Sequence, residues 1–112
     1  MRMAFTIDTK PGSASARLDI KGVFSASELE QVIADLARAR AMMHPAVPRE
    51  PEQTADPHVD LQSDPRFIVS EAPGHGGVVL RLRDAGAGWR AFALPYSEAG
   101  RLGALLDEWS RR

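Results

Sequence analysis

The segment Asp56-Pro57-His58-Val59-Asp60 is the first place where residue types and spacing suggest metal chemistry. An extended chain puts Asp56, His58 and Asp60 on one side, and Asp64 follows four residues later. Carboxylate oxygens and imidazole nitrogens are ligands for zinc and for hard cations. A closed site needs further converging ligands, and no second cluster supplies them. We therefore expect a solvated acidic segment here, with no metal and no cofactor.

Nucleophilic and phosphate-binding signatures are equally weak. None of the eight serines lies in a G-x-S-x-G pattern. The glycine-rich stretch around His75 leads into a predicted strand, whereas phosphate loops normally lead into a helix N-terminus. The chain is therefore expected to be non-enzymatic.

The stretch GVVLRLRDAGAGWRAFALP, residues 77–95, gives the strongest functional signal. Its alternation predicts a β-hairpin with Arg81, Arg83 and Trp89 on one side. Arginine and tryptophan are enriched in protein interfaces, and the same pair could bind phosphates and stack on bases. The alternative without a binding function is a solvent-exposed sheet face. On such a face, the aliphatic parts of the arginine side chains cover the strands and one guanidinium stacks on Trp89.

Composition limits these alternatives. The chain has 112 residues and no cysteine, with a net charge of −1. Residues 45–65 hold one arginine against five carboxylates, which leaves the remainder at only +3. This is far from the basic balance of a dedicated nucleic-acid binder. With no run of 18 apolar residues and no leader-like segment, we expect a cytoplasmic protein that has no membrane span.

Periodicity predicts an α+β fold in a single domain. Residues 1–44 read as strand, strand and helix, the helix beginning with a capping box at Ser25 and Glu28. Residues 45–65 form a proline-rich acidic connector that contains five of the eight prolines. Residues 66–112 read as three strands and a helix from Tyr96 to Trp109. We expect an antiparallel sheet of about five strands with both helices on one face.

The hydrophobic pattern selects the register of each hairpin. In the first, Phe5 is expected opposite Leu18 and Ile7 opposite Ala16. In the second, a three-residue loop of residues 86–88 would pair Leu82 with Phe92, with Gly88 left-handed. The resulting inner face holds Phe67, Val69, Val78, Leu80, Leu82, Phe92 and Leu94. The outer face holds Arg66, Ile68, Val79, Arg81, Arg83, Trp89, Ala91 and Ala93.

The outer face gives the leading hypothesis, a protein-interaction or regulatory module that self-associates, with a homodimer as the simplest case. The predicted interface comprises Arg66, Ile68, Val79, Arg81, Arg83 and Trp89. One alternative is a single-stranded nucleic-acid binder that uses Arg81, Arg83 and Trp89. In a third hypothesis, the acidic connector 45–65 itself binds a basic partner.

Overall fold

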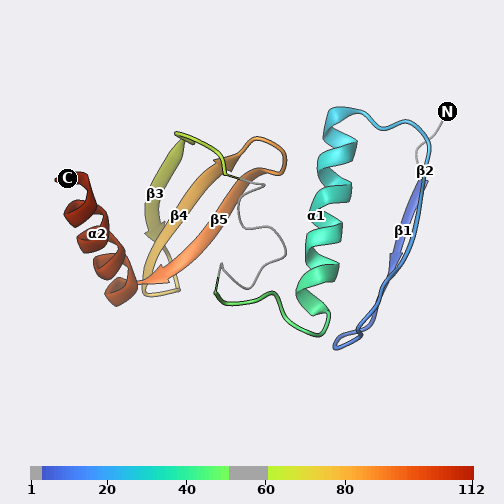
Figure 1. The fold of residues 1–112 in the computed structure, drawn as a ribbon, viewed down its shortest axis with the longest axis horizontal. Coiled ribbons are helices and arrows are strands. Elements are labelled where there is room, and N and C mark those ends of the chain that lie inside the picture. The colour runs from blue at the N-terminus through green and yellow to red at the C-terminus, as the bar shows by residue number, and fades with distance from the viewer. Residues whose placement is uncertain (1–3, 51–60) are drawn as a thin grey trace. The chain divides into compact units, whose positions relative to one another are not determined.

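The computed structural model describes residues 4–50 and 61–112 (Figure 1). The chain divides into two compact units, residues 1–61 and 62–112, and each is described by itself. The expected order β-β-α-β-β-β-α and the α+β class are confirmed. The five strands lie in two antiparallel sheets, of two and three strands. That the two units form one domain stays a prediction.

The first unit is a hairpin with a helix packed on one of its strands. Strand β1 (Ala4–Asp8) pairs with β2 (Arg17–Lys21), and helix α1 (Ala26–Met42) contacts β1. The helix buries Val32 and Ala39, which lie seven residues apart, or two helical turns. These two residues are the buried hydrophobic core of the described part of this unit.

Both ends of α1 are capped by hydrogen bonds. The Ser25 backbone N–H donates to Glu28 Oε1 at 2.9 Å, and the Ser25 hydroxyl accepts from the Glu28 N–H, which confirms the capping box. At the other end, the Gly12 N–H of the hairpin loop donates to the Met42 carbonyl at 2.7 Å. The β1–β2 loop thus caps the end of α1 and fixes the helix against the hairpin.

The second unit is built on a three-stranded sheet in the order β3-β4-β5. Gly88 begins β5 with φ 80°, the left-handed conformation expected there, and Gly86 and Ala87 donate backbone N–H groups to Asp84 Oδ1. The turn is therefore held by Asp84 at the end of β4. The strands are β3 (Phe67–Ala72), β4 (Gly77–Asp84) and β5 (Gly88–Pro95).

Both hairpins differ from the expected register by two residues. Phe5 pairs with Ile20 instead of Leu18, and Leu80 instead of Leu82 pairs with Phe92. The loop between β4 and β5 is residues 85–87 instead of 86–88, because Asp84 closes the turn one residue earlier. A shift of two preserves the facing of every side chain, so the expected inner and outer faces are both present.

Helix α2 (Tyr96–Ser110) begins directly where β5 ends, with Pro95 as its N-cap. It contacts β4 and β5 but contains no buried residue. Figure 1 shows that it follows β5 without an intervening loop. Of its expected inner stripe, Ala99 and Leu102 are half-buried, whereas Leu106 and Trp109 are exposed. In the described residues, no helix has the length and apolarity needed to cross a membrane.

Candidate protein-binding face of the three-stranded sheet

The structure places all six predicted interface residues on the outer face. Arg66, Arg83 and Trp89 form a row across the sheet: the Arg83 N–H donates to the Arg66 carbonyl at 2.9 Å, and Arg83 pairs with Trp89. The next row holds Ile68 and Arg81, which are direct cross-strand partners. Side chains on neighbouring strands at these positions lie about 5 Å apart at Cβ, so the residues form one continuous patch.

Exposure separates this patch into an accessible end and a more covered centre. Ile68 and Trp89 are 50% and 48% exposed, and Arg66 and Arg83 are also exposed. Arg81 is half-buried and donates from Nη1 to the Ser70 hydroxyl at 2.9 Å. The Arg81 guanidinium is thus held by a hydrogen bond within the sheet. The row of Arg66, Arg83 and Trp89 is exposed and can contact a partner.

The outer face carries three positive charges and no carboxylate. Within residues 4–50 and 61–112, no salt bridge includes Arg66, Arg81 or Arg83. By contrast, Arg90 on the opposite face lies 3.9 Å from Asp84. The outer-face residues are Arg66, Ile68, Ser70, Ala72, Gly77, Val79, Arg81, Arg83, Trp89, Ala91, Ala93 and Pro95.

Among the residues that the structure describes, no cation stacks on Trp89, in contrast to the alternative in which an arginine covers it. The cation–π contact within the described ranges is instead on α2, where the Arg112 guanidinium lies 4.4 Å from the Trp109 ring centroid. The exposed half of the Trp89 indole is therefore available to another molecule.

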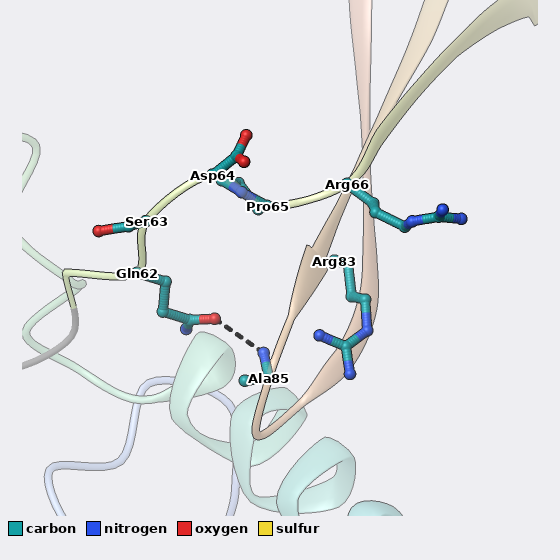
Figure 2. A pocket seen from close by; sticks show the side chains of 7 residues that line it. All are labelled: Gln62, Ser63, Asp64, Pro65, Arg66, Arg83 and Ala85. Carbon is teal, nitrogen blue, oxygen red and sulfur yellow. Dashed lines mark hydrogen bonds between the residues drawn. The ribbon is translucent and has the colours of Figure 1, made fainter.

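Two surface hollows flank the segment that precedes β3. One, of about 520 Å³, lies between residues 62–66 and the end of the β4–β5 hairpin (Figure 2). The Gln62 side-chain oxygen accepts from the Ala85 N–H at 2.7 Å and so ties the two segments together (Figure 2). The second hollow, of about 460 Å³, is lined by residues 64–68 and Trp89.

Sequence reasoning missed this part of the site. The Gln62 contact joins residues 23 positions apart, and no local pattern in the connector indicates it. Asp64, which was weighed as a metal ligand, instead adopts a left-handed φ of 51° before Pro65. Its role here is to turn the chain into the sheet, beside Arg66.

The electrostatics of the hairpin turn follow from the same contacts. The backbone N–H groups of Ala87 and Gly86, and then the Gln62 side chain, hold the pKa of Asp84 below its ordinary value. Asp84 thus stays ionised at neutral pH and keeps the turn closed, which sets the positions of Arg83 and Trp89 on either side of it.

The remaining candidate chemistry is not assembled in the described chain. Asp56, His58 and Asp60 lie outside the described residues, and the described ranges contain no group of three potential metal ligands. His75 lies in the exposed β3–β4 turn. No protein-family model matches the chain, and comparisons with curated proteins and with solved structures find no significant match.

Proposed function

We propose that this chain is a non-enzymatic, cytoplasmic protein-binding module whose outer face docks on an acidic, partly apolar surface of a partner protein. The observation that carries the proposal is the composition of that face, on which three arginines that form no salt bridge within the described residues surround exposed Ile68 and Trp89. Aromatic and arginine side chains dominate binding energy in protein interfaces. The arginines would supply partner selection and association rate.

Charge favours a different partner over a second copy on this face. Two outer faces placed together would bring six arginines close to each other with no carboxylate between them, and like charges in an interface cost several kcal/mol. Self-association through the outer face stays a prediction, but an acidic partner fits the same residues at lower electrostatic cost.

Single-stranded nucleic acid is the second candidate, and one observation favours it. Trp89 lies beside Arg83 and in the same row as Arg66, so one stacking platform ends a row of two phosphate-binding groups. A stacking surface normally uses several aromatic side chains, and Trp89 is the single aromatic residue on this face. The third hypothesis, binding through the acidic connector, falls mostly on residues outside the described ranges.

A fluorescence titration tests the proposal with defined probes. The variant Trp109→Phe leaves Trp89 as the sole tryptophan reporter. We expect a peptide of alternating glutamate and leucine with a central phenylalanine to shift Trp89 emission at low salt. Arg83→Glu should weaken that binding at least about tenfold. The matched control is Arg17→Glu, the same charge reversal on β2 of the other unit.

The outcomes separate the two candidates. Stronger binding to a twelve-nucleotide oligo-dT than to the acidic peptide, with a steep salt dependence, would replace the proposal with the nucleic-acid function. Equal binding by wild type and Arg83→Glu would remove the outer face from either function.

A further inference from the structure

The inner face of the three-stranded sheet is an array of nine side chains, three on each strand, of which five are exposed and four are half-buried. Its middle row is poorly covered: Val69 and Phe92 are 59% and 49% exposed, and Phe67 in the next row is 70% exposed. A helix packed across the face would bury these residues, and α2 does not. The rows are Phe67–Leu82–Arg90, Val69–Leu80–Phe92 and Glu71–Val78–Leu94.

Two opposite charges occupy diagonally opposite corners of this array. Glu71 is on β3 in the row at one end of the array, and Arg90 is on β5 in the row at the other end. Both side chains are exposed. The Arg90 guanidinium lies 3.9 Å from the Asp84 carboxylate, which is a long distance for an ion pair. The other seven positions are all apolar.

We propose that a second copy of this chain covers the inner face, with its strands crossing those of the first copy at a steep angle. In this crossed dimer, Glu71 of each copy meets Arg90 of the partner subunit. The proposal concerns the face opposite to the one assigned to the acidic partner, and it does not depend on that function.

Symmetry singles out this arrangement. Two identical sheets packed face to face are related by a two-fold axis that lies between them and parallel to both. An axis along the strands places Glu71 over an apolar residue, and an axis across the strands does the same. An axis along the diagonal that joins Glu71 and Arg90 places each of these residues over the same residue of the partner subunit, so that like charges meet.

Only an axis along the other diagonal, from Phe67 to Leu94, pairs Glu71 with the partner's Arg90. The same axis places Leu82 over the partner's Val69 and Val78 over the partner's Phe92, so that apolar side chains meet throughout. Strands then cross near a right angle, which is one of the two established ways in which sheets pack.

The exposed apolar area of the inner face supplies about half of the area that a standard interface buries on each partner. The exposed fractions of the inner-face residues amount to roughly 400 Å², if an aromatic side chain contributes about 150–250 Å² and Val or Leu somewhat less. A standard interface buries about 800 Å² per partner, and the exposed side chains of Glu71 and Arg90 at the corners add to this apolar area.

Charge reversal tests the crossed dimer in solution. Sedimentation equilibrium should show a wild-type dimer, and Glu71→Arg or Arg90→Glu should each raise its dissociation constant at least about tenfold. The double variant Glu71→Arg/Arg90→Glu restores both pairs and should return the constant to near the wild-type value. Arg83→Glu is the matched control, since it reverses a charge on the outer face of the same sheet.

Crosslinking gives a readout that does not depend on variant stability. The chain has no cysteine, so Glu71→Cys and Arg90→Cys introduce the only thiols. These positions are about 17 Å apart within one chain, given the spacing of strands and residues in a sheet, while facing sheets lie about 10 Å apart. A bis-maleimide shorter than about 17 Å should link two chains of the double variant covalently and leave each single-cysteine variant without a crosslink, as read on a denaturing gel.

Each contrary result overturns the proposal. A wild-type monomer at all concentrations, with Val69 and Phe92 protected from solvent, would mean that the face is covered within the chain. A dimer that is unaffected by either charge reversal would place the contact elsewhere. Failure of the double reversal to restore the dimer, or equal crosslinking of the single-cysteine variants, would exclude the crossed arrangement.

Discussion

The two units repeat the same order, strands followed by a helix, but only the first unit uses its helix to form a core. Val32 of α1 is 3% exposed, and Ala39 of the same helix is also buried. None of the residues of α2 is buried. The connections differ as well. Residues 22–25 link β2 to α1, and no residue separates β5 from α2.

The length of that connection explains the difference. The chain must reverse its direction before a helix can pack on the strand that precedes it, and this reversal needs a turn between the two elements. The four linker residues of the first unit supply one, and the end of α1 is then tied to the hairpin loop through Gly12. In the second unit Pro95 is at once the last strand residue and the helix N-cap. The first unit therefore has a core of its own, and the second has an open face.

The largest effect is expected from replacing one valine with aspartate in each unit, Val32 on α1 and Val69 on β3. Val32→Asp buries an unpaired charge and should cost at least about 3 kcal/mol of unfolding free energy, with loss of α1 packing. Val69→Asp, on the open face, should cost no more than about 1 kcal/mol in the monomer. Urea denaturation at low protein concentration measures both. Equal costs would show that Val69 is buried after all.

The next effect concerns glycines of the second unit. A Cβ on Gly77 would lie within 3 Å of the Leu94 carbonyl group, which is backbone and cannot rotate away. Gly77→Ala should therefore separate β4 from β5 locally and cost about 2 kcal/mol or more. In Gly103→Ala, a Cβ meets nothing within 4 Å, so this variant should stabilise α2 by up to about 1 kcal/mol. Thermal unfolding of the two variants measures whether each substitution raises or lowers stability. A destabilising Gly103→Ala would mean that α2 is closely packed.

A smaller effect is expected at the helix N-termini, where the units also differ. Ser25→Ala removes the side-chain cap of α1 and should cost about 1 kcal/mol. Pro95 of α2 makes no side-chain cap, so Pro95→Ala should change the unfolding free energy less. Hydrogen exchange of the first turn of each helix distinguishes them. Unchanged exchange in the first turn of α1 after Ser25→Ala would contradict the assigned role of the cap.

The smallest effect is the response to acid. The Ser25 backbone N–H, and then its hydroxyl, hold the pKa of Glu28 below its ordinary value, as the turn amides do for Asp84. A lowered folded-state pKa stabilises the fold above the unfolded-state pKa, and this contribution is lost as the pH falls through the folded value. Carboxyl chemical shifts should show both groups titrating below their ordinary range. A normal pKa for Glu28 in the native protein would mean that the capping box is open.

Pattern and turn chemistry had different predictive power in this chain. Alternation of apolar residues placed Ile68, Arg81 and Trp89 on one face, and the structure has the same facing. The pairing partners were displaced by two residues in both hairpins, because the loop geometry set by Asp84 and by the β1–β2 turn fixes the exact register. A two-residue shift leaves the hydrophobic pattern unchanged, so the pattern could not detect it.

The sequence by itself determined the local structure: the helices, the capping box at Ser25, the strand order and the division of side chains between two faces. These follow from short-range periodicity and from hydrogen bonds within a few residues. Only the tertiary structure decided that the strands form two sheets, that the Gln62 side chain accepts a hydrogen bond from Ala85, and that α2 leaves Val69 exposed. Those outcomes depend on contacts between distant residues and on whether a connection is long enough to reverse the chain, and neither is recorded in a local pattern.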